Sequence, residues 1–225
     1  MQGEFGFGAR PARERLADGA FVLRGFALPF VEPLAEAVAA VAAAAPFRHM
    51  ETPGGGRMSA AMTNCGAFGW ISDRSGYRYS PHDPLNGAGW PPLPEVFTRL
   101  AGEAGEAAGF AGFAPDACLV NRYEPGARMA LHQDRDERDF TQPIVSVSLG
   151  LPITFVFGGP SRRDPTQRVP LQHGDVVVWG GAARLFHHGV LTLRKGEHPR
   201  FGCCRINLTL RRAGAAAGPT DPGRD

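Results

Sequence analysis

The sequence lacks three features that would place the protein in a specialised class. It has 225 residues but only four cysteines, and their spacing is typical neither of a zinc site nor of a secreted disulfide framework. No apolar run approaches the length of a membrane span. Lysine occurs once, at Lys195, among 24 basic residues, and the net charge is only +2. Since the whole chain is nearly neutral, any contact with nucleic acid requires a local basic patch.

These absences predict a cytoplasmic protein that does not contact membranes. Thiols without a disulfide framework indicate a reducing compartment, and the first fifteen residues are too charged for a signal peptide. The length predicts one domain. We expect residues 1–15 to form a flexible arm and residues 213–225, rich in alanine, glycine and proline, to form a disordered tail.

The pattern along the chain changes from helical to extended near residue 117. Helix formers and bounding prolines predict helices over 33–45 and 94–108. Residues 52–80 show little periodicity but contain many aromatics, which favours an ordered functional lid. Many short strands then predict a β-sandwich or barrel. The expected strands are 21–26, 118–123, 144–149, 153–157, 168–171, 175–179 and 204–211.

Three metal-ligand candidates are dispersed along the chain. His132 and Asp134 are separated by one residue, so that on an extended segment both side chains share a face. With His188 they form the two-histidine, one-carboxylate ligand set of a non-haem iron(II) oxygenase. An isolated His-x-Asp is more often a hydrogen-bonded surface pair, and either His187 or His188 fits a structural role, so the residues alone leave both interpretations open.

The segment from Arg205 to Arg211 alternates polar and apolar side chains. Such a strand is ordinarily half exposed, with a solvated polar face. In the functional interpretation the polar face lies inside a barrel, where Arg205 and Arg211 neutralise a bound dicarboxylate through their guanidinium forks. Asn121 and Tyr123 alternate in the same way, and for them ordinary strand polarity and ligand binding fit equally well.

A second group of residues suggests a pocket for a flat, cationic ring. Trp70 and Tyr77 lie in the expected lid, and Asp136 follows the metal-ligand motif. Stacking on an aromatic side chain and attraction to a carboxylate both favour a positively charged base. Core packing for Trp70 and a solvated charge for Asp136 are the alternatives. Arg162, in a Gly/Pro-rich loop, suits either a phosphate contact or a polar turn.

Several stretches, read in order, resemble the AlkB family of DNA-alkylation repair dioxygenases. They are TPGGGRMSAAMTNCGAFGW, YSPHDP, PDACLVNRYEPGARMALHQDRDE, PIVSVSLGLP, HGDVVVWGGAARLFHHGV and RINLTLR, and they cover roughly residues 16 to 212. The resemblance implies a mainly β fold with α, in which a double-stranded β-helix (jelly-roll) core over about 117–212 carries flanking N-terminal helices and a nucleotide-recognition lid over about 50–90. The dioxygenase domain is then 16–212.

The resemblance also implies roles for individual residues. Iron(II) is held by His132, Asp134 and His188, whereas His187 stands where the family usually has tyrosine. Binding of 2-oxoglutarate falls to Asn121, Tyr123, Arg205, Asn207 and Arg211. Contacts to the nucleobase or its strand fall to Trp70, Tyr77, Asp136, Thr52, Met62 and Arg162.

The expected function is oxidative demethylation of N-alkylated bases of the 1-methyladenine and 3-methylcytosine type. It consumes O₂ and 2-oxoglutarate and releases succinate and formaldehyde. The expected partner is alkylated DNA with a single-stranded or flipped base, with RNA as a further substrate, and we expect a monomer. The alternative is a 2-oxoglutarate oxygenase that hydroxylates a small molecule or peptide, which needs no base-stacking lid.

Overall fold

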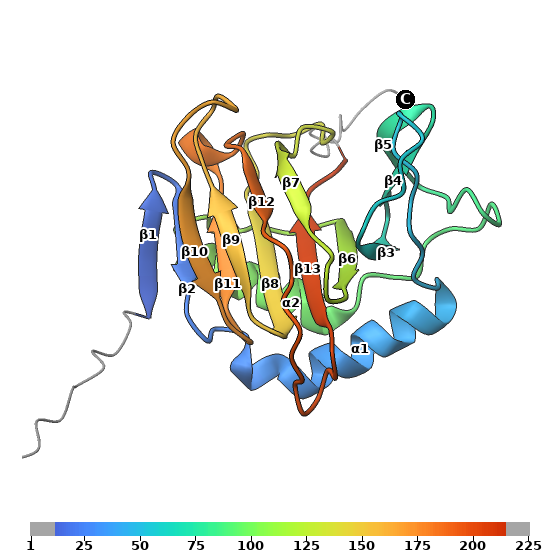
Figure 1. Cartoon of the computed structure of the whole chain (residues 1–225), viewed down its shortest axis with the longest axis horizontal. Helices are drawn as coiled ribbons and strands as arrows, with labels where there is room; N and C mark the ends of the chain where they lie inside the picture. Colours follow the sequence, from blue (N-terminus) through green and yellow to red (C-terminus); the bar gives the residue numbers. More distant parts are fainter. Residues whose placement is uncertain (1–11, 215–225) are drawn as a thin grey trace, which may run out of the picture.

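The computed structural model describes residues 12–214, and its core is a pair of antiparallel β-sheets that face each other (Figure 1). The larger sheet runs in the order β1 (Arg13–Ala17), β2 (Ala20–Leu23), β11 (Val176–Trp179), β8 (Ile144–Gly150), β13 (Arg205–Arg211), β6 (Ala117–Tyr123) and β3 (Ala61–Gly66). The smaller sheet runs in the order β10 (Gln167–Leu171), β9 (Ile153–Phe157), β12 (His188–Val190) and β7 (Met129–His132).

Two helices cover the outer face of the larger sheet. These are α1 (Val31–Ala44) and α2 (Glu95–Ala107), and their buried side chains pack against alternate residues of β6, β8, β11 and β13. On β13 the residues that join this core are Ile206, Leu208 and Leu210. Because strand side chains alternate between faces, Arg205 and Arg211 point toward the smaller sheet. A second apolar cluster, which includes Phe155, fills the space between the two sheets.

A two-stranded hairpin, β4 (Gly69–Asp73) and β5 (Gly76–Ser80), extends from the larger sheet. Its base is fixed by Trp90, which donates a hydrogen bond from Nε1 to the carbonyl of Ser80 at 3.0 Å. The indole lies against Gly69, where a Cβ would approach Trp90 Cε2 to 2.2 Å. Glycine is therefore required at the start of β4, and the hairpin is held rather than free.

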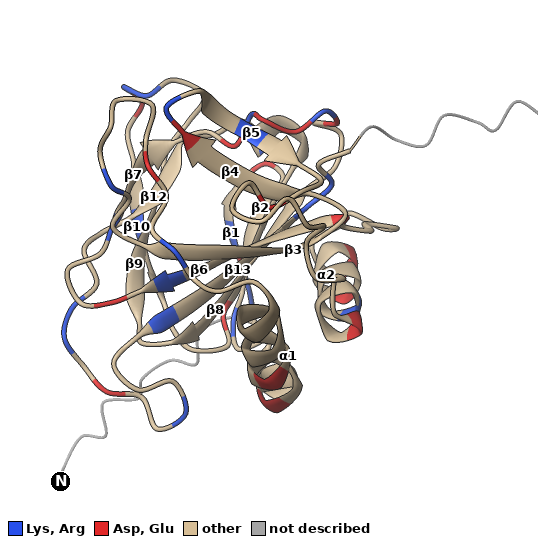
Figure 2. Ribbon diagram, turned by 90° about the vertical axis from the view of Figure 1, so that its right-hand side faces the viewer, with Lys and Arg blue, Asp and Glu red and all other residues tan. Residues whose placement is uncertain are grey.

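Charge is unevenly distributed over the elements (Figure 2). Acidic residues predominate on the two helices, which carry Glu32, Glu36, Glu95, Glu103 and Glu106 against Arg99. Most arginines lie on strands and loops instead. Within residues 12–214, no helix is long and apolar enough to cross a membrane.

The structure confirms the mainly β fold with a jelly-roll core and corrects some boundaries. Strand β1 begins at Arg13, so the expected arm is wrong for residues 12–15, and residues 1–11 lie outside the described residues. The segment 50–90 is not wholly a lid, because β3 within it is an edge strand of the larger sheet. Ala213 is buried and its N–H donates to Asp116, whereas 215–225 lie outside the described residues.

Candidate active site

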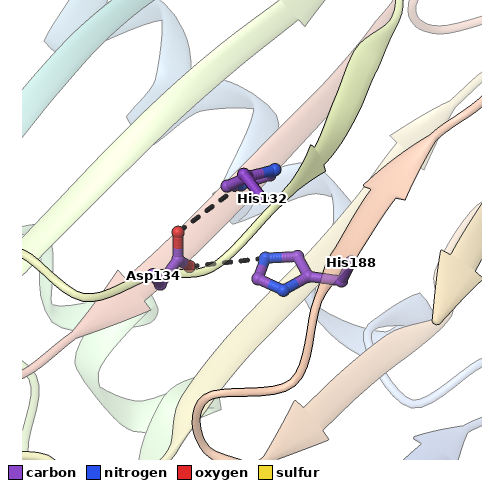
Figure 3. A group of neighbouring side chains, drawn as sticks. All are labelled: His132, Asp134 and His188. Atoms are coloured by element: carbon purple, nitrogen blue, oxygen red, sulfur yellow. Dashed lines mark ion pairs between the residues drawn. The ribbon is translucent and has the colours of Figure 1, made fainter. Parts of the chain in front are cut away.

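His132 at the end of β7, Asp134 just after it and His188 on β12 point toward one another (Figure 3). One potential ligand atom from each lies within 4.8 Å of those of the others. The Nε2 atom of His132 is 3.5 Å from Oδ1 of Asp134, and Nε2 of His188 is 3.6 Å from Oδ2. The structure therefore selects His188, not His187, as the second histidine of the cluster.

The pairing of β7 with β12 creates this arrangement. His188 lies directly opposite His132 in the antiparallel register, followed by an irregularity before Val190. Gly189 lies at the irregularity, where a Cβ would come within 2.6 Å of the carbonyl oxygen of Met129. Only glycine allows the two strands to approach this closely, and their approach brings together histidines that are 56 positions apart in the chain.

Backbone hydrogen bonds orient both imidazoles. Nδ1 of His132 donates to the carbonyl of Ala130 at 2.9 Å, and Nδ1 of His188 donates to that of Phe186 at 3.0 Å. Each Nε2 is left free to bind a metal, as in metal sites where the second ring nitrogen is fixed by an acceptor. Burial, together with the neighbouring His132, lowers the pKa of His188, which favours the neutral form that binds metals.

Asp134 is held as an anion by Arg211. Nη2 and Nε of Arg211 donate to Oδ2 of Asp134 at 2.6 and 3.1 Å. Burial alone would raise the pKa of Asp134, but the guanidinium and the two histidines hold it well below its ordinary value. The cluster thus offers two imidazole nitrogens and one carboxylate on one side, the donor set of a facial iron(II) site with open positions.

A pocket between the two sheets continues from this cluster along β13 and β6. Its lining includes all five residues predicted to bind a dicarboxylate, which are Asn121, Tyr123, Arg205, Asn207 and Arg211. All five side chains are buried, so the alternative of a solvated polar face is wrong. Arg211 is already engaged by Asp134, whereas the other four are free of metal-ligand contacts.

Arg205 is the clearest sign of an anionic ligand in this pocket. Nη2 donates to Ser148 Oγ at 2.9 Å, but Nε and Nη1 have no hydrogen-bond partner among residues 12–214. Burial lowers the pKa of Arg205 to about 10. A buried guanidinium with unpaired donors is unfavourable without an anion. Both the donor set and the unpaired arginine therefore fit iron(II) and 2-oxoglutarate.

The hairpin brings the predicted base-binding residues together at the edge of the site. The rings of Trp70 and Tyr77 stack with centroids 5.5 Å apart and planes 13° apart. Nε1 of Trp70 donates to Oδ2 of Asp136 at 2.8 Å. Two of the three residues thus touch each other and the third is hydrogen-bonded to the indole, on the segment that follows Asp134.

The other three predicted contacts are placed differently. Arg162 is exposed and donates from Nη1 to the carbonyl of Leu131, beside His132. Thr52 lies in a turn, where its Oγ1 accepts from the N–H of Gly56. Met62 is fully buried in the core between the sheets, and the structure does not bring its side chain to the surface of the pocket.

Three residues that sequence reasoning missed surround Asp134. Tyr79 contacts Arg211 and Glu137, and Arg184 contacts Glu137 and the carbonyl of Asp134. Only the alternation of Tyr77 and Tyr79 could have indicated one of them, because it places both rings on one face of a strand. Glu137 and Arg184 carry no local signal.

Comparison with known proteins agrees with this geometry. A family model described as the 2OG-Fe(II) oxygenase superfamily matches residues 19–211. The alpha-ketoglutarate-dependent dioxygenase AlkB of Salmonella typhimurium is 56% identical over 203 residues, covering 90% of this chain and 94% of its own. The Escherichia coli protein of the same name is 55% identical over 206 residues, covering 92% and 95%. The chain belongs to the AlkB family of iron(II)- and 2-oxoglutarate-dependent dioxygenases.

A solved structure supports the same assignment. The structure of OsALKBH1 superposes with a TM-score of 0.77 at 28% identity, covering 89% of this chain and 99% of that one. Membership of the AlkB family identifies iron(II) as the metal for His132, Asp134 and His188, and 2-oxoglutarate and O₂ as co-substrates. The chain is thus an AlkB-family dioxygenase.

Proposed function

We propose that this dioxygenase removes alkyl groups oxidatively from N-alkylated nucleobases of the 1-methyladenine and 3-methylcytosine type. The observation that carries the proposal is the adjacency of two sites. The two-histidine, one-carboxylate cluster includes Asp134, and Asp136, two residues further along the same segment, accepts a hydrogen bond from the aromatic pair on the hairpin. "Nucleobase platform" here means the stacked pair Trp70 and Tyr77. The similarity of this chain to the dioxygenases named AlkB supports the same activity.

The side chains of the pocket bind the metal and the co-substrate and orient them for the reaction. Iron(II) with 2-oxoglutarate and O₂ supplies the oxidation of the N-methyl group, with succinate, CO₂ and formaldehyde as products. His132, Asp134 and His188 hold the metal. Arg205 binds one carboxylate of the co-substrate through its unpaired donors, and Asn121, Tyr123, Asn207 and Arg211 complete the binding site.

The nucleobase platform and its carboxylate select the substrate. A methylated adenine or cytosine is cationic and flat, so it gains from stacking on Trp70 and from the charge of Asp136. A nucleobase that is stacked within a duplex cannot reach a metal site inside such a pocket, so the substrate is single-stranded or its nucleobase is flipped out. We propose DNA as the main substrate and RNA as a further one. Thr52 and Arg162 are proposed to contact the strand.

The chain is proposed to act as a cytoplasmic monomer with one dioxygenase domain, in which the hairpin and its flanking loops form the lid. The alternative of a small-molecule or peptide hydroxylase accounts for the metal cluster and Arg205 but gives no reason for the nucleobase platform. The nucleobase platform, with the carboxylate of Asp136 hydrogen-bonded to its indole at 2.8 Å, therefore favours a nucleobase substrate over a small molecule or peptide.

Mass spectrometry of a defined oligonucleotide tests the proposal. A single-stranded oligonucleotide with one 1-methyladenine is incubated with the protein, iron(II), ascorbate and 2-oxoglutarate, and formaldehyde is measured in parallel. We expect the product to lose one CH₂, with equimolar formaldehyde, only when 2-oxoglutarate is present. The Arg205→Met variant is the matched control for co-substrate dependence. An unchanged oligonucleotide beside rapid 2-oxoglutarate turnover on small molecules would refute the nucleobase assignment.

A further inference from the structure

A continuous series of polar contacts joins the hairpin to the metal ligand Asp134. Tyr79, on β5, donates from its hydroxyl to Oε1 of Glu137 at 2.8 Å and accepts from Nη1 of Arg211 at 3.1 Å. Arg211 donates from Nη2 and Nε to Oδ2 of Asp134 at 2.6 and 3.1 Å. Only one side chain, Arg211, therefore separates the hairpin from a metal ligand.

Arg184 forms a second branch of the same network. Its Nη2 is 3.1 Å from Oε2 of Glu137, and its Nη1 donates to the backbone carbonyl of Asp134 at 2.8 Å. Oε1 of Glu137 is in addition 3.4 Å from Nε of Arg211. Glu137 thus lies between two arginines, one of which holds the side chain of Asp134 and the other its main chain.

Burial makes this network sensitive to each member. The side chains of Glu137, Arg184 and Arg211 are 1%, 3% and 7% exposed. Two carboxylates and two guanidinium groups balance to zero charge, so removing one leaves a buried charge without compensation. Burial also raises the pKa of Tyr79 well above its ordinary value, so its hydroxyl stays protonated and can donate. The network consequently has one preferred arrangement.

The face of the hairpin that carries Tyr79 is also the face that carries the nucleobase platform. Trp70 lies directly opposite Tyr79 in the hairpin register and stacks on Tyr77. Trp70 contacts Asp136, and Tyr79 contacts the next residue, Glu137. The hairpin therefore contacts the segment that begins with Asp134 at two adjacent points, through which binding of a base can act on that segment.

We propose that Tyr79 and Glu137 are positioning residues that couple occupation of the nucleobase platform to the placement of Asp134, and so to the binding of metal and co-substrate. The proposal rests on the proposed function, because the ligand of the platform is taken to be a methylated base. Coupling of this kind is reciprocal: loading of the metal site tightens binding of the base by the same factor as the base tightens the metal site.

The test measures that factor without turnover. Anisotropy of a fluorescein-labelled oligonucleotide with one 1-methyladenine gives its Kd under anaerobic conditions, with and without iron(II) plus 2-oxoglutarate. We expect the loaded wild-type protein to bind about ten-fold more tightly, in the range usual for coupled sites. Tyr79→Phe, which keeps the ring but removes the hydroxyl, should reduce the ratio to less than about two-fold. Glu137→Gln removes the carboxylate that accepts from Tyr79, and it should likewise reduce the ratio to less than about two-fold.

A matched control tests whether any loosening of the hairpin has this effect. Asp73→Asn weakens the exposed pair of Asp73 with Arg78, at 2.6 Å and away from the network, and should retain the wild-type ratio. The proposal is overturned if both Tyr79→Phe and Glu137→Gln keep that ratio, if the wild-type ratio is one, or if Asp73→Asn loses it equally. Thermal unfolding checks that the variants fold. Formaldehyde release by the wild type tests the proposed function separately.

Discussion

Replacing Arg205 by methionine should stabilise the protein that lacks 2-oxoglutarate while abolishing its response to that ligand. Burial lowers the pKa of Arg205 from 12.5 to about 10, which corresponds to on the order of 3 kcal/mol against the buried charge. Methionine has a similar length and no charge, so this cost disappears. Arginine is thus retained at the expense of stability, which is expected of a group that awaits an anion.

The gain is reduced by the contacts that methionine lacks. The hydrogen bond from Arg205 to Ser148 contributes about 1 kcal/mol, and the guanidinium lying 5.2 Å from the ring of Tyr123 contributes a further ~1 kcal/mol. The net stabilisation is therefore about 1 kcal/mol, which for a domain of this size raises Tm by about 2–4 °C.

Thermal and urea unfolding, each followed by circular dichroism with and without 2-oxoglutarate, measure both effects. The wild-type protein with iron(II) should gain about 2.7 kcal/mol when 2-oxoglutarate is present at a hundred times its Kd, and Arg205→Met should gain nothing. Arg205→Lys keeps the charge but loses the fork, so it should respond only at higher 2-oxoglutarate concentrations. A loss of more than about 2 kcal/mol by ligand-free Arg205→Met would show that Arg205 serves the fold, and the reasoning would be wrong.

Three further predictions concern the metal cluster and the substrate. His188→Ala should abolish turnover and the rise in Tm on adding iron(II), whereas His187→Ala should keep both; the opposite result would move the ligand to His187. Gly189→Ala should weaken metal binding at least about ten-fold, as measured by anaerobic titration. Its Cβ would meet the Met129 carbonyl oxygen at 2.6 Å and separate the two strands that carry the histidines. The control Gly89→Ala, at a position with open space around it, should leave metal binding unchanged. Asp136→Asn keeps a hydrogen-bond acceptor for Trp70 but loses the negative charge. Repair of cationic 1-methyladenine, measured by mass spectrometry, should therefore fall several-fold more than repair of a neutral etheno adduct. Equal losses on both substrates would show that Asp136 has a structural role.

The elements that the sequence predicted well are those with a clear internal pattern. Both helices were predicted to within two residues, and β6, β8, β9 and β13 nearly to the residue, because alternation or continuous apolar character follows directly from burial on one or both faces. Strands β1, β3, β4, β5, β7 and β12 were missed. β7 and β12 have only four and three residues, and each gives one position to a ligand histidine, so too few apolar positions remain to show a period.

The residues of the site likewise differ in how well the sequence predicts them. The metal ligands were predicted because their residue types and order are chemically specific, and the alternation along β13 placed Arg205 and Arg211 on one face. The network of Tyr79, Glu137 and Arg184 was not, because its members lie up to 132 positions from their partners and are joined only by the fold. The buried position of Met62 likewise follows from β3 joining the larger sheet, which its weak pattern did not indicate.

The two acidic helices make the charge of this nearly neutral protein uneven over its surface. In Figure 1, the N-terminal end of α1 lies far from the β4–β5 hairpin, while exposed arginines such as Arg135 and Arg162 flank the metal-binding segment. A polyanion that approaches in solution should be disfavoured beside the acidic helices and favoured beside these arginines. Association should therefore be faster than a net charge of +2 implies, and it should slow as salt shortens the range of the field.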